Sequence, residues 1–323
     1  MQKYIKYIVL LIGVLTTLSA KDIEEIKPMC DNDNVDTCLE MGLNYYIGEG
    51  VIQDTKQSII YFNIACNAGN ATGCYNLGIM YDLGVGGEQN FLKAIKFYDK
   101  SCTYGHAMGC YNLGIMHDQG VFKDTFKAVK YFALACEAGD TSGCLNLGYK
   151  YDRGEGVEKD FLKASTFYTQ ACEAKDAMAC YNLGLMYEIG EGVMYDTFKA
   201  VKYFSLACEG GDANGCMNLG YKYDRGEGVD QDFLRAMKLY TKACDGKDAI
   251  GCYNLGNMHL KGDGVKEDKF EAFKYFTKSC AGGYVESCHL LGIMKDDDMN
   301  EFPLDRILEE YNTYVNLNIE SSN

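Results

Sequence analysis

Several residue types and patterns that would indicate particular functions are missing from the chain. Tryptophan is absent and proline occurs only twice, so no proline-rich linker separates domains. No run of basic residues occurs, and the excess of acidic residues gives a formal net charge of −15 at pH 7. An acidic chain of this size repels nucleic-acid phosphates and anionic lipid headgroups. The composition therefore argues against DNA, RNA and membrane surfaces as partners.

Recognisable catalytic motifs are also missing. The chain has none of the S-x-x-K, S-D-N and K-T-G motifs of serine β-lactamases, and it has no G-x-S-x-G elbow. The four histidines, at positions 106, 117, 259 and 289, form no H-x-x-x-H or H-x-H pair that would suggest a metal site. His117 and His259 occupy a slot that tyrosine fills in other copies of a repeat, so we expect packed rings there. We assign no catalytic residue, metal or cofactor.

The first twenty residues have the features of an export signal. Lys3 and Lys6 form a short positive start, and the apolar stretch Tyr7 to Leu15 is too short to span a bilayer. Leu18-Ser19-Ala20 then places a small residue before a natural cleavage point; a membrane anchor is the alternative. Removing residues 1–20 would leave 29 basic and 46 acidic residues and a net charge of −17. We predict a secreted or periplasmic protein without membrane contact after cleavage.

The sixteen cysteines reveal an internal repeat. They form eight C-x7-C pairs, and the first cysteines of successive pairs lie 36 residues apart, except for a step of 34 from Cys102 to Cys136. A period of this length is typical of a solenoid of helical hairpins. The short step falls at Gly120-Val121, which lacks the Glu-Gly of other copies, so the deletion lies in a loop. The sequence therefore predicts an all-α solenoid.

Each repeat is predicted to contain two helices. In the first helix, typified by residues 177–187, Leu183 and Tyr187 share a face and Gly184 lets a neighbouring helix approach closely. The segment Gly190 to Val193 breaks this helix. Asp196 then caps a second helix, Thr197 to Glu209, whose apolar residues have helical spacing.

The cysteine pairs lie where one repeat meets the next. One cysteine falls in the last turn of a second helix and the other in the first turn of the following helix. A bond between them stabilises by roughly 2–3 kcal/mol in the chain-entropy model. Zinc binding is the alternative, but the spacing exceeds the usual C-x2–4-C, and export favours oxidation. The predicted disulfides are Cys30–Cys38, Cys66–Cys74, Cys102–Cys110, Cys136–Cys144, Cys172–Cys180, Cys208–Cys216, Cys244–Cys252 and Cys280–Cys288.

The repeat also sets the expected domain boundaries. After the signal at 1–20, residues 21–36 form an N-terminal lead-in, and residues 37–302 hold about seven repeats of 36 residues. The first helix of an eighth repeat is expected at 285–295, and residues 303–323 are expected to form a capping helix and a tail. Residues 146–157 recur without change at 218–229, so a block of two repeats was duplicated.

Six asparagines occupy one slot of successive first helices, which line the concave face in related solenoids. Carboxamides can hydrogen-bond the backbone of an extended peptide whatever its sequence. Lys150, Arg153, Lys222 and Arg225, one or two turns further on, would bind carboxylates, and methionines between them suit adaptable apolar contact. The alternatives are that the asparagines bond neighbouring repeats within the stack and that the cations are ordinary solvated charges. The predicted ligand-binding asparagines are Asn76, Asn112, Asn146, Asn182, Asn218 and Asn254.

The recurring pieces A-x-x-x-Y-N-L-G-x-x-Y, G-x-G-V, D-x-x-K-A and A-C resemble Sel1-like repeats, relatives of the tetratricopeptide repeat. With the C-x7-C pairs and the signal, residues 30–295 resemble the Helicobacter cysteine-rich protein family. The first unit departs from the motif, because Leu39-Glu40-Met41-Gly42 lacks the asparagine. The resemblance implies a right-handed superhelix of α/α hairpins with one disulfide per repeat. It also implies secretion, with penicillin binding and weak β-lactamase activity in some members, and adaptor roles in the wider Sel1-like group.

Two functional hypotheses follow. The first is a disulfide-rich scaffold that binds a peptide, a protein or a cell-wall-related ligand in its concave groove. The alternative is a weak β-lactamase or penicillin-binding hydrolase that holds a β-lactam or peptidoglycan fragment in the same groove. The alternative rests on the family resemblance alone, because the sequence contains no catalytic motif.

Overall fold

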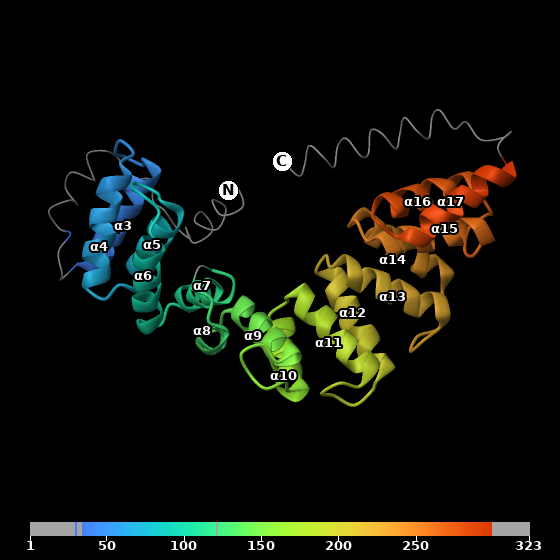
Figure 1. Cartoon of the computed structure of the whole chain (residues 1–323), viewed down its shortest axis with the longest axis horizontal. Coiled ribbons are helices and arrows are strands. Elements are labelled where there is room, and N and C mark those ends of the chain that lie inside the picture. Colours follow the sequence, from blue (N-terminus) through green and yellow to red (C-terminus); the bar gives the residue numbers. More distant parts are fainter. Residues whose placement is uncertain (1–29, 31–33, 121, 299–323) are drawn as a thin grey trace. The chain divides into compact units, whose positions relative to one another are not determined.

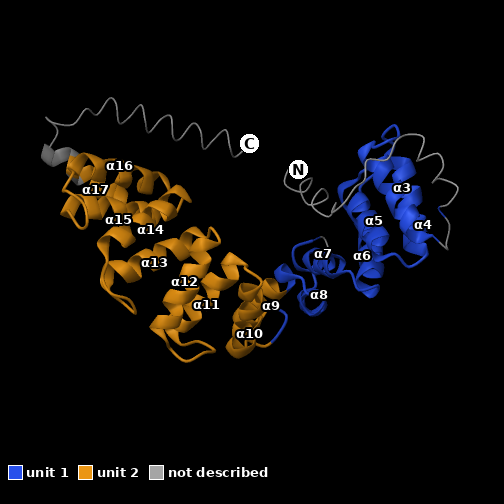
Figure 2. Cartoon of the chain, turned by 180° about the vertical axis from the view of Figure 1, so that it is seen from behind, with its two compact units in different colours: residues 1–143, 155–157 blue, residues 144–154, 158–323 orange. Residues whose placement is uncertain are grey.

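The computed structural model describes residue 30 and residues 34–120 and 122–298, which form fifteen helices and their connecting loops, without a strand (Figure 1). The chain divides into two compact units (Figure 2). Unit 1 consists of residues 1–143 and 155–157, and unit 2 of residues 144–154 and 158–323. The predicted signal at 1–20, most of the lead-in and the predicted capping helix and tail at 303–323 lie outside the described residues.

First and second helices alternate along the chain. The first helices are α3 (Val35–Ile47), α5 (Ala71–Leu83), α7 (Ala107–Asp118), α9 (Thr141–Arg153), α11 (Ala177–Ile189), α13 (Ala213–Arg225), α15 (Ala249–Lys261) and α17 (Val285–Asp298). The second helices are α4 (Thr55–Asn67), α6 (Phe91–Thr103), α8 (Thr125–Glu137), α10 (Phe161–Glu173), α12 (Thr197–Glu209), α14 (Phe233–Asp245) and α16 (Lys269–Ala281). The predicted helix Thr197 to Glu209 coincides with α12.

Side-chain caps and glycines set the helix ends. Asp196 precedes α12 in an extended conformation, and its carboxylate accepts a hydrogen bond from the backbone N–H of Lys199 at 3.0 Å. Asp212 caps α13 in the same way through Gly215. Gly190 ends α11 with a φ of 78°, a left-handed conformation that favours glycine. The predicted positions of cap and helix break in this repeat are therefore confirmed.

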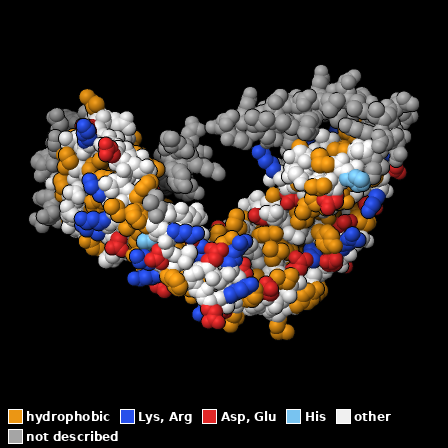
Figure 3. Space-filling view, in the orientation of Figure 1, with side chains coloured by type: hydrophobic (Ala, Val, Ile, Leu, Met, Phe, Trp, Pro, Cys, Tyr) orange, Lys and Arg blue, Asp and Glu red, His pale blue; other side chains and the backbone are white. Residues whose placement is uncertain are grey.

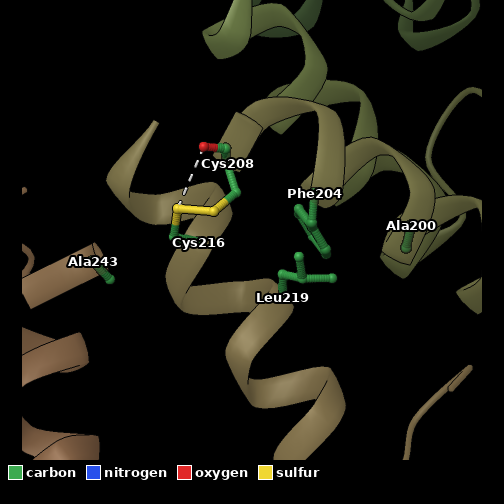
Figure 4. Packing of buried hydrophobic residues seen from close by; sticks show 6 residues of the cluster. All are labelled: Ala200, Phe204, Cys208, Cys216, Leu219 and Ala243. Carbon is green, nitrogen blue, oxygen red and sulfur yellow. Dashed lines mark hydrogen bonds between the residues drawn. A yellow bond between two sulfur atoms is a disulfide. The ribbon is translucent and has the colours of Figure 1, made fainter. Parts of the chain in front are cut away.

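One contact recurs in every described hairpin: an aromatic ring of the second helix packs directly against a glycine of the first. A Cβ atom on Gly184 would come within 2.7 Å of the ring of Phe204, which is fully buried. Figure 4 shows Phe204 of α12 beside Leu219, which belongs to the next helix, α13. The glycine–ring pairs are Gly42–Phe62, Gly78–Tyr98, Gly114–Phe132, Gly148–Tyr168, Gly184–Phe204, Gly220–Tyr240 and Gly256–Phe276.

Disulfides join the hairpins as the repeat predicts. Seven of the predicted pairs are bonded, with Cα–Cα distances from 4.5 to 4.8 Å. Cys208 in the last turn of α12 and Cys216 in the first turn of α13 show the arrangement (Figure 4). Cys136 and Cys144 are disulfide-bonded as well, and no described cysteine is free. The predicted all-α, disulfide-stapled array of helical hairpins is confirmed.

Helix α7 has an unusual cap, because His106 stands where Asn70, Asp176 and Asp212 cap other first helices. Nδ1 of His106 accepts a hydrogen bond from the backbone N–H of Gly109 at 3.3 Å, so this nitrogen carries no proton. The ring also stacks on Tyr75 with centroids 4.6 Å apart. Burial lowers the pKa of His106, which favours the neutral ring that the cap requires.

Stability near His106 should therefore depend on pH. The unfolded chain binds a proton near the ordinary histidine pKa of about 6.5, whereas the folded state holds the ring neutral. The contribution of His106 is fully present above that pH and is lost as the pH falls towards the lowered pKa of the folded state. His106→Asn, which copies the cap at Asn70, should show a smaller drop in melting temperature between pH 7.5 and 5. Equal drops in both proteins would contradict the role of the imidazole.

The glycine–ring contact predicts opposite effects of one substitution at two equivalent positions. Gly184→Ala should lower the free energy of unfolding by about 1–3 kcal/mol, because the added methyl group meets the ring of Phe204. Gly292 occupies the same slot of α17 and is exposed, and a methyl group added there would meet no atom of the described residues within 4 Å. Gly292→Ala should therefore gain about 0.5–1 kcal/mol from helix propensity. The free energies are measured by urea unfolding. If both substitutions change the free energy of unfolding in the same direction, the contact with the ring does not determine the effect.

Candidate functional site

The six asparagines that the sequence predicts to bind a ligand are half-buried. Two of them, Asn76 and Asn112, belong to unit 1, and the other four, Asn146, Asn182, Asn218 and Asn254, belong to unit 2. Each lies in the second turn of its first helix, as the repeat predicts. Part of each carboxamide therefore reaches the surface, and part is in contact with neighbouring residues.

Some asparagines also join successive first helices. The carboxamide of Asn112 on α7 is hydrogen-bonded to the hydroxyl groups of Tyr75 on α5 and Tyr98 on α6. Burial raises the pKa of Tyr75 to about 12, so its hydroxyl remains protonated at neutral pH. Asn218 on α13 is likewise hydrogen-bonded to Tyr181 on α11, and its amide donates to the backbone oxygen of Asn214 at 3.1 Å. At these two positions the asparagine stabilises the stack, whatever it also binds.

The slot four residues after the asparagine is buried, contrary to the expectation of a ligand-facing surface. Lys150 and Lys222 are each only 3% exposed, and Met80, Met186 and Met258 are similarly buried in the same slot. Met80 packs in one cluster with Leu43 and Tyr46 of α3, and Lys222 reaches Glu188 of α11, so at these two positions the side chain lies between neighbouring first helices. Lys150 and Lys222 are therefore not the solvent-facing anchors that the sequence suggested, and these methionines are core residues.

Lys222 has specific partners that explain how its charge is buried. Its Nζ atom lies 2.5 Å from Oε1 of Glu188 and 2.8 Å from Oε2 of Glu227. Burial alone would lower the pKa of Lys222, but the hydrogen bonds and charges of Glu188 and Glu227 outweigh it and raise the pKa. Glu188 lies on α11 and Glu227 in the loop after α13, so the ammonium group ties one hairpin to the next.

The slot seven residues after the asparagine is exposed and carries two arginines in unit 2. The guanidinium of Arg153 lies 4.4 Å from the ring centroid of Tyr149, and that of Arg225 lies 5.6 Å from Tyr221. Both tyrosines are partly exposed, at 36% and 38%. Stacking on a ring restrains a guanidinium but leaves its N–H donors available to a carboxylate. Arg153 and Arg225 lie where a ligand could reach them.

Apolar side chains accompany these arginines. On α11, which contacts α13, Met178 is 55% and Ile189 is 62% exposed. Figure 3 shows hydrophobic side chains interspersed with charges of both signs over α11 to α14. The first-helix surface of unit 2 thus combines half-buried carboxamides, two stacked cations and exposed apolar side chains. Such a mixture suits a polypeptide better than a purely charged or purely apolar ligand.

The histidines of the described part of the chain belong to no cluster of metal ligands, and His117 and His259 pack against rings. No group of three His, Cys, Asp or Glu side chains could hold a metal ion there. His117 and His259, expected as packed rings, stack on Tyr131 and Tyr275 with centroids 5.6 and 5.4 Å apart. Among the described helices, none is long and apolar enough to cross a membrane.

Comparison with known proteins adds a family to this geometry. The model of the Sel1 repeat matches seven consecutive segments: 35–70, 71–106, 107–140, 141–176, 177–212, 213–248 and 249–284. None of the curated proteins matches the chain. The matched segments cover most of the described residues, and each runs from the start of a first helix to the residue before the next one.

Two solved structures, of an SLR-fold antigen and of a Sel1 repeat protein, show the same fold. A protective antigen present in uropathogenic Escherichia coli strains, which displays an SLR fold, has a TM-score of 0.80 at 28% identity, over 85% of this chain and 60% of that chain. A Sel1 repeat protein from Oxalobacter formigenes has a TM-score of 0.69 at 25% identity, over 85% of this chain and 80% of that chain. The cysteine rich protein B of Helicobacter pylori is 34% identical over 41% of this chain and 96% of that chain, with a TM-score of 0.35.

The buried position of Lys222 predicts that an apolar side chain can replace it. Lys222→Met, which copies the equivalent Met186 and Met258, should change the free energy of unfolding by less than about 1 kcal/mol, or raise it. Lys222→Ala should lower it by about 2–5 kcal/mol, because the truncated side chain leaves a cavity. Urea unfolding distinguishes the two. If both variants lose the same amount, the ion pairs with Glu188 and Glu227 outweigh the packing.

Proposed function

Because the chain belongs to the Sel1 repeat family, whose repeats generally mediate protein interactions, we propose that it is an exported scaffold that binds an extended segment of a partner protein. The binding surface is the first-helix face of unit 2. The ligand is a peptide with acidic residues and at least one apolar residue. One observation carries the proposal: Arg153 and Arg225 are exposed and stacked on tyrosines in equivalent positions of two hairpins.

The charge of the molecule makes these two arginines distinctive. The chain has a net charge of −15, so an acidic peptide is repelled by most of its surface. Cations at the third residue of several second helices are engaged: Lys163, Lys199 and Arg235 pair with the aspartates that cap their own helices. Attraction on the first-helix face therefore comes from Arg153 and Arg225 and from Lys261, which occupies the same slot of α15, and the two stacked arginines would fix the register of a bound peptide.

The half-buried asparagines would hold the peptide backbone between those two anchors. Asn182 and Asn218 lie on neighbouring first helices, and a carboxamide can donate to a carbonyl and accept from an N–H. Exposed Met178 and Ile189 on α11 offer contact to an apolar side chain. Backbone contacts give affinity without sequence preference, whereas the two arginines would select for acidic residues.

Export is the second part of the proposal. Disulfides form and persist in oxidising compartments and are rare in a reducing cytosol. A chain whose cysteines are all bonded in the described structure fits a periplasmic or extracellular location. The residues expected to direct export, 1–20, lie outside the described part of the chain.

The proposal predicts which peptides the protein selects. A displayed library of random 12-residue peptides, panned on oxidised protein, should yield peptides with acidic residues. The double variant Arg153→Gln/Arg225→Gln should bind a selected peptide at least about tenfold more weakly by fluorescence anisotropy, since a charged hydrogen bond contributes about 1.5–3 kcal/mol. Arg235→Gln is the matched control, because Arg235 is exposed on α14 but paired with Asp232. Equal losses in the control and the double variant would contradict the site.

A second variant tests the asparagines and the enzymatic alternative together. Asn182→Ala, which spares the stacking contacts of Asn218, should weaken binding of the same peptide by about three- to tenfold while thermal unfolding stays nearly unchanged. A drop of several degrees would place Asn182 in the stack instead, as Asn218 already is. Hydrolysis of a chromogenic β-lactam by the oxidised protein, lost in this variant, would replace the scaffold with a hydrolase.

A further inference from the structure

The second hairpin departs from the repeat at three positions of one loop. Five other loops have an acidic residue at the position of Val85, and all others have valine at the position of Gly87. The cap of the following helix is Asn90, whereas the other six second helices are capped by aspartate. The changes therefore remove two negative charges and one branched side chain from a single loop.

These positions line a pocket of about 370 Å³ in unit 1. In five other loops the valine side chain at the position of Gly87 is half-buried, as at Val193 and Val229. A Cβ atom on Gly87 would meet nothing within 4 Å, so the space that valine occupies elsewhere is open here. The residues around this space are Ile59, Tyr81, Val85, Gly86, Gly87, Glu88, Asn90 and Lys93.

The pocket contains a cation without its usual partner. In four other hairpins a Lys or Arg at the third residue of the second helix pairs with the capping aspartate, as Lys163 pairs with Asp160 at 3.6 Å. In this hairpin the cap is Asn90, and no described carboxylate forms an ion pair with Lys93. Nζ of Lys93 lies 4.8 Å from the ring centroid of Tyr81.

The rest of the lining is apolar or small. Val85, Ile59 and Tyr81 belong to one cluster of packed side chains, which also includes Phe97 stacked on Tyr81. Gly87 leaves the backbone accessible to a ligand, whereas Gly86 is packed against Ile59 and Thr55. Glu88 also lines the pocket, but it is exposed, so water screens its charge. The pocket thus combines one ammonium group with an apolar wall.

From these observations we infer that the pocket binds a small amphipathic carboxylate. The carboxylate contacts Nζ of Lys93, and the apolar part lies on Ile59, Val85 and Tyr81. Two kinds of ligand carry a carboxylate beside an apolar group: a free amphipathic acid and the C-terminal residue of a peptide. None of these residues belongs to the first-helix face of unit 2, so the test of this pocket and the test of the peptide site have independent outcomes.

Reversion to the pattern of the other hairpins tests the pocket without damaging the fold. Gly87→Val fills the open space, and Asn90→Asp gives Lys93 the partner that its equivalents have. Both variants restore residues that the other hairpins carry, and Gly87 does not have a positive φ. We therefore expect them to melt at the temperature of the wild type or above. If one of the two variants melts at a lower temperature than the wild type, the binding test relies on the other variant and on Lys93→Gln, which removes the ammonium group and should also weaken binding.

The probe is N-acetyl-leucine, titrated against the oxidised full chain and followed by saturation-transfer difference NMR. Wild type should bind it saturably, and Gly87→Val and Asn90→Asp should each weaken binding at least about tenfold, or about 1.4 kcal/mol. N-acetyl-leucinamide, which lacks the charge, should bind the wild type no more tightly than the acid binds these variants. Glu88→Gln should strengthen binding of the acid by about two- to fivefold, because a nearby negative charge is removed.

Two outcomes would overturn the inference: no saturable binding of N-acetyl-leucine, or equal binding by wild type and both reversion variants. Equal binding of the acid and the amide would overturn the role of Lys93. A short peptide ending in leucine, with a free or an amidated C-terminus, distinguishes the sources. Tighter binding of the free peptide than of N-acetyl-leucine indicates a protein terminus, and weaker binding indicates a free acid.

Discussion

The close approach of an aromatic ring to a glycine is the constraint on which the hairpins depend. It fixes the distance between first and second helices, because any larger residue at the glycine would push the ring away. The ring alternates along the chain: Phe62, Phe132, Phe204 and Phe276 alternate with Tyr98, Tyr168 and Tyr240. The duplication of a two-repeat block is therefore visible in the core as well as on the surface.

The tyrosines in this alternation need a partner for a hydroxyl that the phenylalanines lack. The hydroxyl of Tyr98 donates to Oδ2 of Asp82 at 3.4 Å, and that of Tyr240 donates to Oδ2 of Asp224 at 3.5 Å. Burial raises the pKa of Asp82, so this carboxylate is easier to protonate than an exposed one. Each aspartate lies four residues after the glycine that the tyrosine ring contacts. One face of the first helix therefore supplies both the glycine that accommodates the ring and the carboxylate that binds its hydroxyl.

The sequence predicts well whatever the repeat imposes locally and predicts poorly what depends on neighbouring hairpins. The period, the cysteine pairs, the cap at Asp196 and the packed ring of His117 follow from spacing and from comparison of equivalent positions. The burial of Lys222 does not, because its partners Glu188 and Glu227 come from another helix and from a loop. The sequence does contain a signal for this burial. Other repeats have methionine at the position of Lys222, as at Met186 and Met258, and an apolar side chain at a repeated position indicates that the position is buried.

The disulfides have a consequence for how the chain finds its covalent structure. Sixteen thiols allow a very large number of pairings, yet each bond joins cysteines only eight positions apart, whereas the next candidate is at least 26 positions away. Closing the longer loop costs about 1 kcal/mol more. Correct pairing is thus favoured in the unfolded chain itself and needs no earlier assembly of distant segments. Oxidation can proceed bond by bond from the N-terminus, in the order in which the cysteines emerge.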